Sequence, residues 1–82
     1  MIHVEVKFFG PLRDVVGFDE MQISVSPPYT GESAFEVLSS RHPEVGLWRS
    51  SLRLAVNLEY VDFSKVLHEG DELCFVPPVS GG

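Results

Sequence analysis

Residues 2–8 alternate strictly between apolar and polar side chains. Because successive side chains of a strand point to opposite faces, this alternation predicts a strand with one buried face. A glycine-proline pair at 10–11 ends that strand, and residues 12–16 are predicted to form a short helical turn that Gly17 closes. Residues 21–26 alternate again, so these two strands are expected to form an antiparallel pair.

The one long helix is expected to lie between Thr30 and Pro43. Thr30 is a suitable N-cap, because its hydroxyl can accept a hydrogen bond from a backbone N–H of the first turn. Pro43 cannot continue a helix and is predicted to stop it. The stripe predicted to face a sheet consists of Ala34, Val37, Leu38 and the stem of Arg41, with Phe35 at its edge.

The second half of the chain predicts three more strands, at 52–57, 60–61 and 72–76. The first and last of these alternate in the same way as the N-terminal strand. A turn at 57–59 joins the first two, and the connecting segments are expected to add apolar side chains to the core. Those side chains are Leu47, Trp48, Val66 and Leu67.

The predicted order of elements is β-β-α-β-β-β. One helix across one face of a mixed five-stranded sheet is an α+β, two-layer domain. A right-handed crossover from the second strand through the helix to the third would place the first and last strands side by side in the middle of the sheet. This arrangement is the ubiquitin-like β-grasp. We therefore predict a β-grasp domain over residues 1–76 and an extended C-terminal tail over residues 77–82.

The tail is the most unusual stretch of the sequence. Two prolines, Pro77 and Pro78, end the last strand and favour an extended exit from the fold. Val79 and Ser80 follow, and then Gly81 and Gly82. Glycine has no Cβ and can enter a slot too narrow for other residues. We expect the α-carboxylate of Gly82 to be presented to a partner.

Composition narrows the class of function. The net charge of −6 disfavours nucleic acid and anionic membranes as partners, and no apolar run is long enough to span a bilayer. The polar N-terminal residues do not resemble a signal peptide, so a cytoplasmic location is expected. Cys74 is the sole cysteine and has no predicted cationic neighbour, and no ligand spacing for a metal is present. No bound cofactor, metal site or self-contained active site is predicted.

Three segments together resemble the small subunits of molybdopterin synthase. The members of that family are ubiquitin-like sulfur carriers. The most specific is GDELCFVPPVSGG at 70–82, and the others are VKFFG at 6–10 with Arg13-Asp14 and LAVN at 54–57. The similarity runs through the whole chain. Departures are the loop at 27–31, which is slightly long, and Cys74 at a position expected to vary.

The resemblance implies how the tail is used. An E1-like adenylyltransferase would use ATP to adenylate Gly82, and a sulfur donor would convert it to a thiocarboxylate. The large synthase subunit would then receive the tail, with Gly81 permitting entry and residues 77–80 positioning it. Sulfur would pass to cyclic pyranopterin monophosphate. A heterotetramer of two small and two large subunits is implied, in which the chain is no enzyme on its own.

A docking surface is predicted on the sheet face that the helix leaves open. Alternation assigns Phe9, Cys74 and Val76 to that face, and Tyr60 is opposite in phase to Val61. Arg13 is expected to add a charged contact at the rim.

Two other functions stay open at this stage. One is a sulfur carrier of another pathway, for thiamine, cysteine or tRNA thiolation. The other is a β-grasp adaptor that binds partners through its open face, with its terminal glycines unused.

Overall fold

The first two strands form an antiparallel pair, as predicted. The computed structural model describes residues 1–77, and in it β1 (Ile2–Lys7) pairs with β2 (Glu20–Val25) with Val4 opposite Ile23. Between them lies α1 (Gly10–Val16), which ends at Gly17 with φ of 87°. A glycine adopts this left-handed backbone without steric cost, so it both ends the helix and turns the chain back toward β2.

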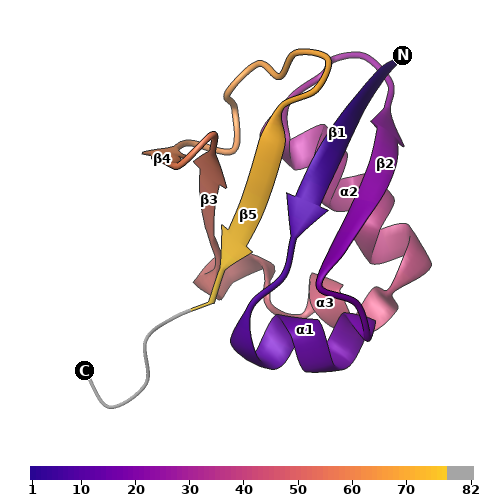
Figure 1. Cartoon of the computed structure of the whole chain (residues 1–82), viewed down its shortest axis with the longest axis vertical. Helices are drawn as coiled ribbons and strands as arrows, with labels where there is room; N and C mark the ends of the chain where they lie inside the picture. Colours follow the sequence, from indigo (N-terminus) through magenta and orange to yellow (C-terminus); the bar gives the residue numbers. More distant parts are fainter. Residues whose placement is uncertain (78–82) are drawn as a thin grey trace.

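The main helix, α2 (Gly31–Arg41), begins where the sequence predicts. Thr30 Oγ1 accepts a hydrogen bond of 3.2 Å from the backbone N–H of Ser33. Figure 1 shows α2 lying across one face of the sheet. The predicted buried stripe differs from the structure at two residues. Phe35 is part of the core and not at its edge, and Val37 is only partly buried.

The connection after α2 differs from the prediction in its buried residues. It contains α3 (Pro43–Gly46) and the 3-10 turn η1 (Arg49–Ser51). Val45 is fully buried, while Leu47 is 87% exposed, so the prediction for Leu47 is wrong. A four-residue helix makes only one turn. The side chain on its inner side, Val45, is therefore buried, and Leu47 just after its end points outward. Trp48 does pack against the core as predicted.

The C-terminal half supplies β3 (Arg53–Val56), β4 (Glu59–Val61) and β5 (Glu72–Val76). The strand order is β2-β1-β5-β3-β4, with β1 and β5 parallel and the other neighbours antiparallel. The first and last strands are thus central neighbours, and the predicted β-grasp topology is confirmed. In the loop before β5, Leu67 is buried as expected. Val66 is 54% exposed, so the prediction that it belongs to the core is wrong.

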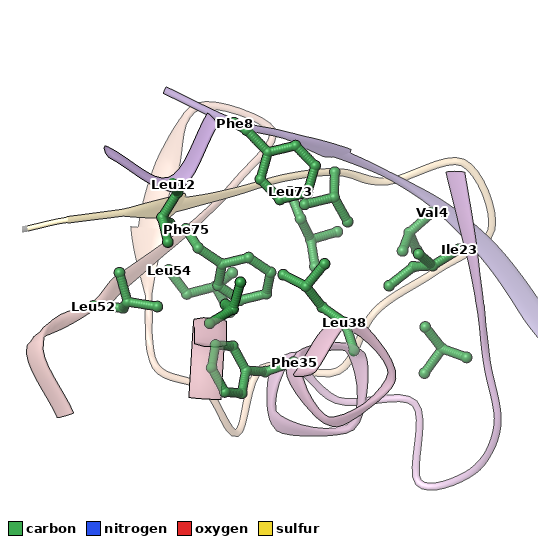
Figure 2. Close-up of a cluster of buried hydrophobic side chains, with 14 of the residues drawn as sticks. Val4, Phe8, Leu12, Ile23, Phe35, Leu38, Leu52, Leu54, Leu73 and Phe75 are labelled. Carbon is green, nitrogen blue, oxygen red and sulfur yellow. The ribbon is translucent and has the colours of Figure 1, made fainter. Parts of the chain in front are cut away.

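The core lies between α2 and the covered face of the sheet. Figure 2 shows Phe35 of α2 directed toward Leu54 and Phe75, and the rings of Phe35 and Phe75 meet edge to face at 5.4 Å between centroids. No charged or polar side chain is buried among residues 1–77. Hydrophobic burial therefore dominates the stability of this domain.

An arginine fastens the loop before β5 to the helix layer. The guanidinium carbon of Arg49 lies 3.4 Å from the centroid of the Phe63 ring, which stacks against Phe75. Arg49 also donates hydrogen bonds to the Glu32 carboxylate from both Nε and Nη2. The shortest of them runs from Nη2 to Oε1 over 2.6 Å. This arrangement, which we call the Arg49 clamp, joins α2, η1 and the loop that leads to β5.

Within the part of the chain that the structure describes, no helix has both the length and the apolar character needed to cross a membrane.

Gly31 is predicted to be essential for packing α2 against the sheet. A Cβ at this position would lie 2.3 Å from Leu54 Cδ2 and 3.1 Å from the backbone oxygen of Phe63. We expect Gly31→Ala to lower the free energy of unfolding by about 1–3 kcal/mol through overpacking, measured by urea unfolding. The control is Gly46→Ala, whose new Cβ would meet only Ser39 Cβ at an ordinary 3.7 Å. An equal effect of both variants would contradict the steric explanation.

The Arg49 clamp predicts an acid-dependent part of the stability. The hydrogen bond from Arg49 holds the pKa of Glu32 below its ordinary value of 4.5, and burial opposes this shift. Since the folded state holds the proton less tightly than the unfolded state, this stabilisation is present above about pH 4.5 and is lost as the pH falls through the folded pKa.

Glu32→Gln should therefore be less stable than the wild type at pH 7, and the difference should shrink below pH 4.5 in urea unfolding measured across this range. Glu36→Gln on the same helix is the control, because Glu36 has no ion-pair partner among residues 1–77. A difference for Glu32→Gln that does not change with pH would show that the pair contributes through packing alone.

Candidate functional site

The sheet face opposite α2 carries the side chains that alternate with the core. Strand register places Lys7 of β1, Cys74 of β5, Ala55 of β3 and Tyr60 of β4 in one row across four strands. Cys74 and Ala55 are half-buried, and the side chains at the two ends of the row are charged or aromatic. The row therefore has a small apolar centre between a cation and an exposed ring.

The last strand directs the chain out from the middle of this face. Val76 ends β5 opposite Arg53 of β3, and both Val76 and Pro77 are half-buried. The five residues predicted to form the rest of the tail lie outside the described residues. They are Pro78, Val79, Ser80, Gly81 and Gly82.

Phe9 is exposed as expected but does not belong to the strand. β1 ends at Lys7, and Phe9 is the N-cap residue of α1, with 58% of its surface exposed. The sequence predicted that Phe9 lies on the open face of the sheet because it alternates with the core residues of β1. That reason is wrong, because the strand ends at Lys7 and the helix begins at Gly10. The parallel pairing of β1 with β5 ends at Lys7 and Cys74, two residues before Phe9 and Val76.

Arg13 and Phe9 line one hollow of about 340 Å³ at the start of α1. The guanidinium of Arg13 is paired with the carboxylate of Asp19, and both side chains are mostly exposed. An exposed ion pair of this kind contributes little to stability and can be exchanged for a contact with a partner. The structure therefore brings together two of the predicted docking residues.

Tyr60 lies at the other side of the face and is 65% exposed. It lines a separate hollow of about 490 Å³ with Arg53, whose guanidinium carbon is 6.0 Å from the Tyr60 ring centroid. Sequence reasoning missed Arg53. Its position opposite Val76 follows from the register of β3 with β5, which no local pattern reveals.

Charged side chains border the apolar centre of the face. Lys7 Nζ lies 3.0 Å from Glu20 Oε2 and 3.8 Å from Glu72 Oε2. The hydrogen bond and charge of Glu20, with the charge of Glu72, raise the pKa of Lys7, so it is a cation at neutral pH. The face thus combines exposed rings with fixed charges, as protein-binding surfaces do.

Cys74 has the properties of a packed thiol. Burial raises its pKa, and the charge of Glu72 raises it further. A thiol must lose its proton to act as a nucleophile, so this environment opposes catalysis by Cys74. Among residues 1–77 no group of three or more His, Cys, Asp or Glu side chains could hold a metal ion. The described face is suited to binding another protein.

Known proteins share both the sequence and the fold. Human molybdopterin synthase sulfur carrier subunit is 32% identical, over 100% of this chain and 97% of its own length. A Pyrococcus furiosus protein assigned to subunit 1 of molybdopterin converting factor has a TM-score of 0.85 and 26% identity, covering 96% of this chain and all of its own. Small archaeal modifier protein 1 of Haloferax volcanii has a TM-score of 0.83 and 26% identity over the same shares.

The family assignment rests on nearly the whole chain. Residues 6–82 match the model of the ThiS family, and this match includes the five tail residues that lie outside the described part. The human relative is 32% identical over 97% of its length. The chain therefore belongs to the ThiS family.

Proposed function

We propose that this protein is the sulfur carrier subunit of a molybdopterin synthase and that Gly82 carries the sulfur. The observation that carries this proposal is the family match through residue 82, together with full-length similarity to a human protein of that name. The match includes Gly81 and Gly82, the residues with which the proposed chemistry begins.

The chemistry proceeds at the Gly82 carboxyl group. A carboxylate oxygen attacks the α-phosphate of ATP, pyrophosphate leaves, and an acyl-adenylate forms. A sulfur nucleophile at the oxidation level of hydrosulfide then attacks the carbonyl carbon, and AMP leaves with the original oxygen. The product is a thiocarboxylate. Its sulfur bonds to a carbon of cyclic pyranopterin monophosphate and displaces an oxygen there, and water then cleaves the bond between the acyl carbon and the sulfur and restores the carboxylate.

Two partner proteins supply the catalytic groups. An E1-like adenylyltransferase binds ATP and activates the tail, and the large synthase subunit binds the pterin, in a heterotetramer of two small and two large subunits. This chain binds no cofactor itself and acts in the cytoplasm. The high pKa of the Cys74 thiol agrees with this division of labour, since it leaves no reactive sulfur on the described face.

The docking face orients the tail toward either partner. We propose that Phe9, Arg13, Tyr60 and Val76 contact the partner while Pro77, Pro78, Val79 and Ser80 lead the two glycines into its active site. The exposure of Phe9 and Tyr60 supports this role, because burying an aromatic side chain is a large part of the energy of many interfaces. Val76 supports it by its position at the start of the tail.

A second candidate uses the same activation with another acceptor. The similarity to a small archaeal modifier protein, at 26% identity and a TM-score of 0.83, favours a carrier or modifier that serves a pathway other than molybdopterin synthesis. The two candidates share the adenylate and differ in the partner that accepts the activated tail.

The carrier proposal predicts a mass change at the C-terminus. Incubated with its activating enzyme, ATP and a sulfur donor, the protein should gain the mass difference between sulfur and oxygen, measured by intact mass spectrometry. A variant lacking Gly81 and Gly82 is the control and should gain nothing. If the wild type never exchanges oxygen for sulfur, the carrier proposal fails. If the thiocarboxylate forms but large subunit and pterin yield no molybdopterin, only the pathway is wrong.

The docking face predicts a specific role for Phe9. Phe9→Asp should weaken binding to the large subunit by about tenfold or more, because it places a charge where a ring is to be buried. The folded state should be unaffected, since Phe9 is already 58% exposed. Titration calorimetry measures the affinity and circular dichroism the fold.

Phe18→Asp is the matched control for this experiment. Phe18 is also 58% exposed but follows the opposite end of α1. Equal binding by wild type and Phe9→Asp would remove Phe9 from the interface, and unfolding of Phe9→Asp would assign the ring to the core.

A further inference from the structure

The turn between β3 and β4 holds a leucine in a backbone conformation that leucine disfavours. Val56 pairs with Glu59, so Asn57 and Leu58 form a two-residue turn, with φ of 50° and 72°. Turns of this type require positive φ at both central residues and favour asparagine followed by glycine. A leucine in this conformation lowers the ratio of folded to unfolded protein by a factor of roughly 5 to 30.

Among residues 1–77, two other non-glycine residues have positive φ, and the fold compensates each of them. Asn57 is of a residue type that tolerates this backbone, and it makes three hydrogen bonds to Asp71 and Glu72. Tyr29, with φ of 42°, packs against the core, and its backbone N–H and C=O are bonded to Ser26 and Leu67.

Leu58 has no such compensation. Its side chain is 92% exposed, the highest value among the large exposed apolar side chains of residues 1–77. A residue that is both strained and exposed weakens the free domain on two counts, because glycine would relieve the backbone and a polar side chain would suit the solvent. Residues 1–77 leave this side chain uncovered, so a partner that buried Leu58 would offset its backbone strain.

The turn presents Leu58 rigidly. Asn57 donates its backbone N–H to Glu72 O over 2.8 Å and its side-chain N–H to Asp71 Oδ1 over 3.0 Å, and its Oδ1 accepts the backbone N–H of Glu72. The Asp71 carboxylate also accepts the backbone N–H of His68. These bonds fix the turn to the start of β5. A side chain on a fixed support loses little freedom on binding.

The position of the turn indicates which partner meets Leu58. Asn57 is bonded at the Glu72 end of β5, and the tail leaves from the Val76 end, about 13 Å along the strand. A stable interface covers about 800 Å² on each partner, a patch roughly 30 Å across. A partner that receives the tail and covers the open face of β5 therefore extends to the turn. Figure 1 shows β3, and beyond it β4, on the side of β5 away from β1.

We propose that Leu58 is an apolar anchor that inserts into a pocket of the large synthase subunit, at the opposite end of β5 from the tail. This inference rests on the proposed function for the identity of the partner. A stoichiometric subunit is favoured over the transient activating enzyme, because permanent interfaces are the more apolar ones.

The test compares stability and affinity in the same variants. Leu58→Gly should leave the unfolding midpoint unchanged or raise it by a few degrees, because relief of the backbone opposes the added flexibility of the unfolded chain. The same variant should bind the large subunit about tenfold more weakly in titration calorimetry. Leu58→Asn, which also tolerates positive φ, should behave in the same way.

Leu47→Gly is the matched control. Leu47 is 87% exposed but has an ordinary right-handed backbone, with φ of −68°. This variant should keep full affinity and gain no stability.

Each other outcome overturns the proposal. Wild-type affinity in Leu58→Gly removes Leu58 from the interface, and a lower midpoint shows that Leu58 is compensated within the fold. A loss confined to self-association or to the activating enzyme assigns the anchor to a different partner. If the wild-type chain does not bind the large subunit, the proposed function itself fails, and this result is distinct from an effect of Leu58 alone.

Discussion

The parallel pairing of β1 with β5 is the constraint on which the rest of this structure depends. It joins the two ends of the described chain in the middle of the sheet, with Val6 opposite Leu73 and both side chains fully buried. Neither β1–β2 nor β3–β4 alone would form a stable layer, since a single hairpin is marginal in water. The central pair unites the two hairpins into one sheet that a single helix can cover.

The loop before β5 must be fixed for that pairing to hold. Its residue Phe63 stacks against Phe75 of β5, and the guanidinium carbon of Arg49 lies 3.4 Å from the centroid of the Phe63 ring. Glu32 orients the guanidinium with charge-assisted hydrogen bonds. Residues of the helix layer thus hold the loop that precedes β5 in place. The turn at Asn57 holds the start of the strand by hydrogen bonds to Asp71 and Glu72. The strand that carries the tail is fixed from both layers.

The sequence predicted the elements whose signals are periodic and missed those that depend on distant contacts. Alternation in residues 72–76 correctly assigned Leu73 and Phe75 to the core. Four-residue α3 has too few turns for a period, so Leu47 was expected inside although Val45 takes that place. The tail motif could be recognised because it is a continuous stretch of sequence. The position of Arg53 could be found only from the strand register, and the strain at Leu58 only from the backbone angles.

A carrier tail on a central strand has a mechanical advantage over one on an edge strand. β5 is bonded to β1 from Glu72 to Cys74 and to β3 from Leu73 to Val76, so its middle cannot be peeled from the sheet without breaking two ladders at once. An edge strand has one ladder and unpaired groups that invite pairing with other chains. Val76 pairs with β3 alone, so if a partner draws in the tail as proposed, the force on Pro77 would meet one ladder at Val76 and two ladders from Cys74 inward, where peeling would stop.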